Sequence, residues 1–200
     1  MKKLLVLLVV LFPIGFLQAQ DTFSKHEIFV GYGFGPISLS KVDLPVDEFS
    51  GAVYSVENEN KHGTQNIGYM FHVSDRFAIG LSYANTSIRR NIVLGSAASV
   101  NGKVVDKYNI IMPSAKYEWY EYGSRWFVYS RIAAGLTFAR GKATYINIMA
   151  ETVTHVKHST SFSWQVIPVG IEYDLPYFSI FAEAGAGVCG YAQLGFRVRI

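Results

Sequence analysis

Apolar and polar residues alternate along most of the chain, and the alternation is longest between Tyr108 and Phe138. Two runs, one on each side of residues 121–125, place aromatic and aliphatic side chains on one parity and mainly small or charged side chains on the other. A period of two residues predicts β-strands. Each run exceeds the roughly 9 to 11 residues that a tilted strand needs to cross a bilayer. The pair therefore predicts a hairpin long enough to span a membrane.

The same alternation predicts eight strands in all, the other six near residues 28–35, 66–73, 77–84, 165–173, 178–187 and 193–200. Three long connections carry charged residues with Pro or Gly, which predicts solvated loops at 36–63, 88–104 and 141–158. The remaining connections are short. Short turns at one end and longer loops at the other are typical of outer-membrane barrels. The expected fold class is all-β, an eight-stranded antiparallel up-and-down transmembrane barrel with both termini on the periplasmic side.

The parity without the aromatic and aliphatic side chains predicts which face of these strands lies inside. It is dominated by Gly, Ala and Ser, which suit the narrow interior of a small barrel. It also carries a few charges, and three carboxylates among four cations can pair across a closed interior. The expected interior ion pairs involve Lys116, Glu118, Arg131, Glu172, Glu183, Arg197 and Arg199. A soluble barrel of the lipocalin type shows the same alternation with the faces exchanged, and it stays an alternative.

Aromatic residues gather at two of the short connections. Tyr117, Trp119 and Trp126 lie beside the turn at 121–125, and Tyr173 and Tyr177 lie beside the next short turn. Clusters of this kind form the aromatic girdle at a membrane interface. They favour a barrel whose apolar parity faces lipid.

The first residues have the parts of a secretory signal: a basic start, an apolar segment at 4–17 and a small residue, Ala19, at the cleavage point. We expect residues 1–19 to be removed and residues 20–200 to form one outer-membrane β-barrel domain. Without the signal, 16 Lys+Arg and 15 Asp+Glu remain, and this near-neutral balance argues against a nucleic-acid partner. Cys189 is the single cysteine, so the fold has no internal disulfide.

With these features, and with an amphipathic last strand from Leu194 to Ile200, the chain resembles the small eight-stranded outer-membrane β-barrel family of Gram-negative bacteria. The resemblance covers nearly all of the chain after the signal and rests on pattern, not on a catalytic motif. It implies a monomer in the outer membrane, without a cofactor or metal. The partners that it implies are outer-membrane lipid and lipopolysaccharide, the barrel-assembly machinery and periplasmic chaperones.

Some eight-stranded outer-membrane barrels modify lipid A, so the Ser, His and acidic residues are candidates for a hydrolase. Hydrolysis by a serine needs a base at hydrogen-bond distance and an acid that orients the base. His158 and Ser159 lie at the expected extracellular end, where Glu151 or Glu172 would supply the acid. A second pair, within His72–Ser74, lies at a periplasmic turn, far from lipid A in the outer leaflet.

Several cations fall at the expected extracellular rim, where they could pair with lipopolysaccharide phosphates or only keep the loops solvated. The expected lipopolysaccharide contacts are Arg89, Arg90 and Lys142, with Lys103, Lys107, Arg140 and Lys157 nearby. Eight strands leave an interior just filled by side chains, which argues against a wide pore. We therefore expect a non-enzymatic outer-membrane barrel with a structural or loop-mediated binding role at the cell surface. The alternatives are a lipid A-modifying hydrolase and a soluble lipocalin-like ligand carrier.

Overall fold

The computed structural model describes residues 25–36, 54–94, 100–122, 125–146 and 152–200. The regular structure within these ranges is β-strand. In this part of the chain no helix combines the length and the apolar character of a membrane span. The predicted signal peptide at 1–19 and residues 37–53 of the first predicted loop lie outside the described residues.

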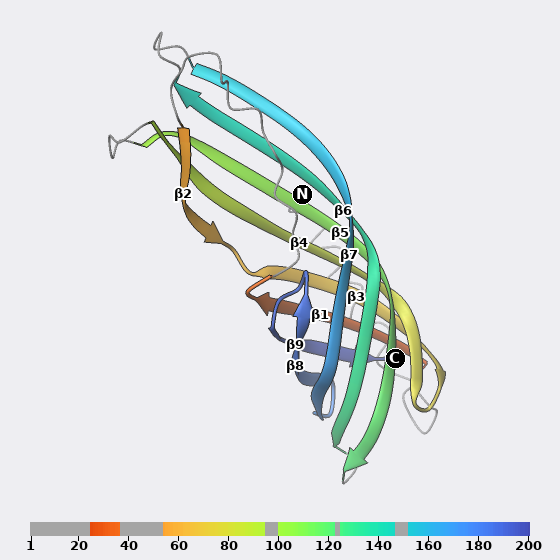
Figure 1. Ribbon diagram of the computed structural model, residues 1–200. Helices are drawn as coiled ribbons and strands as arrows, with labels where there is room; N and C mark the ends of the chain where they lie inside the picture. Colours follow the sequence, from red (N-terminus) through yellow and green to blue (C-terminus); the bar gives the residue numbers. More distant parts are fainter. Residues whose placement is uncertain (1–24, 37–53, 95–99, 123–124, 147–151) are drawn as a thin grey trace.

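The strands are much longer in the middle of the chain than at its ends. They are β1 (His26–Phe34), β2 (Tyr54–Lys61), β3 (Thr64–Ser74), β4 (Phe77–Leu94), β5 (Val100–Tyr122), β6 (Trp126–Ile146), β7 (Thr152–Asp174), β8 (Ser179–Gly187) and β9 (Ala192–Arg199). The four strands β4 to β7 have 18 to 23 residues each, whereas β1, β8 and β9 have 8 or 9. The barrel is therefore tall on one side and short on the other (Figure 1).

All strand pairs are antiparallel, and the sheet closes on itself. β1 pairs with β9, where Glu27 is opposite Arg199, and also with β3. From β3 the ring continues through β4, β5, β6, β7 and β8 back to β9. β2 and β3 pair with different levels of β4, so together they occupy one position of the ring. The structure confirms the predicted eight-stranded antiparallel up-and-down barrel.

The prediction of solvated loops at 88–104 and 141–158 is wrong for most of their length. β4 and β5 stay paired as far as Val93 and Val100, and β6 and β7 as far as Ile146 and Thr152. Part of the first predicted loop is also a strand, because β2 pairs with the upper end of β4. Charged residues on one face of these segments suggested loops, but the backbone hydrogen bonds of the ladder continue through them.

These outer parts of the sheet form an extension above the closed barrel. We define the extension as β2 with residues 86–94, 100–108, 139–146 and 152–163, and the body as the rest of the described barrel. β8 reaches β7 only from Gln165 downward, so among the described residues the extension part of β7 pairs with β6 alone. The body is a closed ring, and the extension is an open sheet.

The short side of the barrel is closed at its upper end by the turn between β8 and β9, which folds inward. Val188 and Cys189 are buried there. The Thr64 hydroxyl donates to the Val188 carbonyl at 3.1 Å, and the Gln165 amide nitrogen donates to the Gly190 carbonyl at 3.2 Å. Gly33 makes room for the turn, because a Cβ there would lie 1.8 Å from the Cys189 carbonyl oxygen.

In the body the apolar parity faces outward. On β6, Val128, Ile132, Leu136 and Phe138 share the outer face, and the last three are 45 to 58% exposed. The ten steps from Val128 to Phe138, at about 3.3 Å each and a tilt near 40°, rise about 25 Å, which is the height of the apolar band of an outer-membrane barrel. This arrangement excludes the soluble lipocalin-like carrier, whose apolar face would point inward.

Candidate functional site

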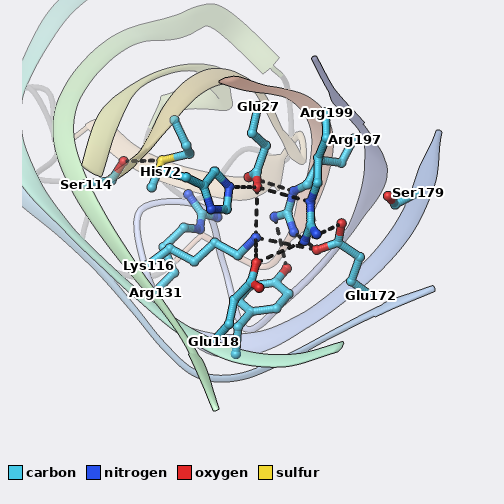
Figure 2. A network of polar contacts seen from close by, with 12 residues as sticks. Glu27, His72, Ser114, Lys116, Glu118, Arg131, Glu172, Ser179, Arg197 and Arg199 are labelled. Atoms are coloured by element: carbon cyan, nitrogen blue, oxygen red, sulfur yellow. Dashed lines mark hydrogen bonds and ion pairs between the residues drawn. The ribbon is translucent and has the colours of Figure 1, made fainter. Parts of the chain in front are cut away.

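The interior of the body holds a network of charged side chains from opposite walls of the barrel (Figure 2). At its centre is Glu27 of β1, which is fully buried. Its Oε2 lies 2.9 Å from the Lys116 ammonium, and its Oε1 lies 2.8 Å from Nε of Arg197. The Lys116 contact joins β1 to β5 across the barrel, two strands that the backbone ladder does not connect directly, whereas Arg197 lies on the neighbouring strand β9.

Other members extend the network toward the periplasmic end. Arg199 lies 2.9 Å from Glu118 and 3.1 Å from Glu172, and Arg197 also pairs with Glu172. The Lys116 ammonium is 2.9 Å from Glu118. Each of these carboxylates has at least two cationic neighbours, so their negative charge is compensated although they are buried, as the physical cost of burial requires.

Arg131 and Glu183 form the upper part of the network. Arg131 donates from Nε at 3.1 Å and from Nη2 at 2.6 Å, a two-pronged pair that fits the planar guanidinium group. The Tyr129 hydroxyl donates to the same carboxylate at 2.9 Å. Arg131 also lies over the ring of Phe29, 4.9 Å from its centroid. Aromatic faces thus cover the parts of the guanidinium groups that carboxylates do not reach.

The structure places all seven charged residues predicted for the interior on the inner face of the body. It adds two that the sequence reading missed, Glu27 and His72, whose Nε2 lies 3.0 Å from Glu27 Oε2. With Glu27 the interior set contains four carboxylates and four cations, among the described residues. Its parity with Phe29 was the available signal, but Glu27 lies near the start of the first strand, where the alternation has barely begun.

Part of the network has the spacing of a metal site. One ligand atom each from Glu27, His72 and Glu118 lies within 4.8 Å of the other two, a spacing that suits a metal ion. The Lys116 ammonium, 2.9 Å from both carboxylates, already supplies the positive charge there. We therefore assign this cluster a structural role.

The residues considered for a hydrolase do not come together. His158 and Ser159 are adjacent and exposed on β7, so their side chains point to opposite faces of the sheet. Glu172 lies fourteen residues further along the same strand, about 45 Å away at 3.3 Å per residue, and it pairs with Arg197. Glu151 lies outside the described residues. His72 points into the interior network, whereas Ser74 is exposed.

The outer face of the extension carries a second group of charges, which we call the basic band. Its members are exposed, point outward and come from three neighbouring strands: Arg89, Lys103, Lys107, Arg140 and Lys142. Lys107 is directly opposite Arg140, and Arg140 is opposite His158. On β4 to β7 the outward Lys and Arg of the described extension therefore have no acidic side chain on the same face.

Two of the cations predicted near the rim have other positions. Arg90 points to the inner face, and its guanidinium pairs with the buried carboxylate of Asp106. Lys157 is exposed but has the inward parity of β7, opposite Gly141. Of the three predicted lipopolysaccharide contacts, Arg89 and Lys142 therefore belong to the basic band and Arg90 does not.

A scan against protein-family models and a search of curated proteins found no match for this chain. Among solved structures the fold is similar to that of Ail, the attachment invasion locus protein of Yersinia pestis, with a TM-score of 0.52 and 17% identity over 90% of this chain and 100% of that chain. A second structure of Ail, in complex with the heparin analogue sucrose octasulfate, matches with a TM-score of 0.44 and 16% identity over 89% and 100% of the two chains.

This likeness shows the fold. The chain has the eight-stranded transmembrane barrel of small outer-membrane proteins, as the sequence predicted. Its apolar exterior is the surface that such a barrel presents to lipid. The outer membrane is accordingly the place of this protein.

Proposed function

We propose that this protein is a non-enzymatic barrel whose basic band holds phosphate groups of lipopolysaccharide and whose extension serves binding at the cell surface. The observation that supports the proposal is the position of the band. On β6 the outward side chains change from Leu136 and Phe138 to Arg140 and Lys142 in consecutive outward positions. The cations therefore begin where the apolar belt ends, at the level of the lipid headgroups.

The charges of the band favour an anionic partner. Like charges directly opposite on neighbouring strands repel each other, as Lys107 and Arg140 do here. A phosphate group between them would replace this repulsion by charge-assisted hydrogen bonds. Lipid A phosphates lie in the outer leaflet, at the same height as the band. The proposal thus gives the unbalanced charge of this face a partner of matching sign and position.

The choice of a binding role over catalysis is supported by the arrangement of the hydrolytic candidates. In the pair within His72–Ser74, His72 points into the interior, where its Nε2 lies 3.0 Å from Glu27, whereas Ser74 is exposed. His158 and Ser159 point to opposite faces of β7. Glu172 is held in the interior by Arg197 and Arg199. Neither predicted Ser–His pair thus has its serine and histidine side by side, which supports a binding role.

The test compares binding of bisphosphorylated lipid A and of dephosphorylated lipid A to the purified barrel. We expect the double variant Lys107→Gln, Arg140→Gln to bind the phosphorylated form about tenfold more weakly, if each contact contributes about 0.7 kcal/mol. The matched control, Lys25→Gln with Arg76→Gln, removes two exposed charges at the periplasmic end. It should bind as the wild type does.

Equal binding of the two lipids by the wild type, or an unchanged affinity in the band variant, would refute the proposal. Mass spectrometry of lipid A from cells with and without the protein tests the enzymatic alternative. An altered lipid A profile would favour the hydrolase.

A further inference from the structure

The outer face of the body contains an apolar hollow of about 830 Å³ across β4, β5, β6 and β7. Its floor consists of small outward residues, Pro113, Ala115 and Ala134. Larger side chains line the hollow as well, among them Ile79 of β4 and Trp164 of β7. The hollow is therefore a groove in the lipid-facing surface.

The strand register explains why the surface is hollow here. Ala115 is opposite Ile79 on β4 and Ile132 on β6, and Ala134 is opposite Trp164 on β7. A small side chain thus stands beside a large one in two consecutive outward rows. Side chains stand roughly perpendicular to a sheet, so the difference in size becomes a difference in depth.

The groove lies below the basic band on the same strands. Ala134 and Arg140 are both on β6, six residues and therefore about 20 Å apart along the strand. At a strand tilt near 40° this is a vertical distance of about 15 Å, half the thickness of the hydrocarbon core. A lipid whose phosphate is at the band would reach the groove with the end of an acyl chain.

We propose that the groove receives an acyl chain of a phosphate-bearing lipid whose headgroup is bound at the basic band. The inference rests on the proposed function of the band and adds a second point of attachment. Any membrane lipid can fill the groove, but a lipid held at the band has a high effective concentration there. The groove and the band together would retain anionic lipid longer than either does alone.

Trp164, at the wall of the groove, provides the test. The chain has three tryptophans, so a background with Trp119→Phe and Trp126→Phe leaves Trp164 as the single tryptophan, whose emission is excited selectively over that of tyrosine. The protein is reconstituted in phosphatidylcholine vesicles of two kinds. One contains a small fraction of phosphatidic acid with brominated chains, and the other contains the same fraction of phosphatidylcholine with brominated chains. We expect the brominated phosphatidic acid to quench Trp164 severalfold more efficiently than the brominated phosphatidylcholine at equal fractions.

Ala134→Leu fills the floor without touching the interior, because Ala134 points outward. It should lower the quenching by phosphatidic acid to the level of phosphatidylcholine, whereas co-purification of phosphatidic acid with the protein should persist. The matched control Ala182→Leu, on the outward face of β8 and outside the groove, should leave the difference unchanged.

Equal quenching by the two brominated lipids in the wild type, with phosphatidic acid still co-purifying, would overturn the groove inference and leave the proposed function standing. If phosphatidic acid does not co-purify with the wild type, the proposed function itself is contradicted. An Ala134→Leu variant with unchanged lipid preference but reduced self-association, measured by energy transfer between labelled copies, would show that a second copy covers the groove instead.

Discussion

The body and the extension of the sheet have the same alternation but opposite polarity. In the body the outward side chains are apolar, as at Ile132, and the inward ones include buried ions such as Arg131. In the extension the outward side chains include the cations of the basic band. The inward ones are mostly buried apolar groups, among them Val104, Ala143 and Tyr145.

The inversion shows where the membrane ends. A strand that continues in register keeps its two faces, and only the surroundings of those faces change. Outward residues are apolar along the belt that faces lipid, and they become Lys and Arg beyond it, where we propose that water and phosphate replace lipid. Inward residues are ions where opposite charges can meet. In the body they come from opposite walls of a closed ring, whereas in the extension Arg90 and Asp106 pair between two neighbouring strands.

The largest expected effect is a loss of stability of the body. Arg197→Ala removes one cationic partner of Glu27 and of Glu172, both buried, and we expect it to lower the free energy of unfolding by about 3–5 kcal/mol. Arg140→Ala, in the extension, should change it by less than about 0.5 kcal/mol. The free energy of unfolding of both variants is measured by urea titration, with heat-modifiable gel mobility as the readout of the folded fraction. Equal stability of the two variants would mean that the interior network does not support the barrel.

A smaller effect is expected at the inward turn on the short side of the body. Gly33→Ala places a Cβ against the backbone carbonyl of Cys189, which cannot move without displacing the turn. We expect destabilisation of roughly 1–3 kcal/mol in the same unfolding assay, as in other overpacked sites. Gly63→Ala is the control, because a Cβ there meets the flexible ring of Tyr32. A Gly33→Ala variant as stable as the control would place the turn elsewhere.

In the extension, Asp106→Asn weakens the pairing with Arg90. The amide can keep a hydrogen bond, so we expect a local loss of about 1 kcal/mol. Hydrogen exchange should become faster in the extension parts of β4 and β5, while exchange in the body stays slow. Faster exchange throughout the barrel would show that the two regions unfold together.

The smallest expected effect is the response to salt, which should differ between the exposed charges of the basic band and the buried charges of the body. Raising the salt concentration from 0.01 M to 1 M shortens the Debye length from about 30 Å to about 3 Å. Binding of bisphosphorylated lipid A should weaken by a few tenths of a kcal/mol for each contact of the basic band. The unfolding midpoint of the body should stay nearly constant, because its ions are shielded from solvent. Lipid binding that is insensitive to salt would argue against phosphate recognition.

The fold could be read from the sequence to a large extent. Alternation with a period of two predicts strands wherever it occurs, and the aromatic turns with the apolar parity indicate a lipid-facing exterior. The seven interior charges were also predictable, because a charge on the inward parity of a closed barrel must find a partner. Arg131 and Glu183, for example, share that parity on different strands and pair at 2.6 Å.

Only the tertiary structure decided how far the strands continue and which charges meet. The segments at 88–104 and 141–158 carry charges that are equally compatible with a loop and with one face of a strand, and their pairing depends on partners distant in the sequence. Likewise, only the strand register shows that the cations of the basic band point outward while Arg90 points inward. Local alternation determines which side chains share a face, but the closure of the ring determines what each face meets.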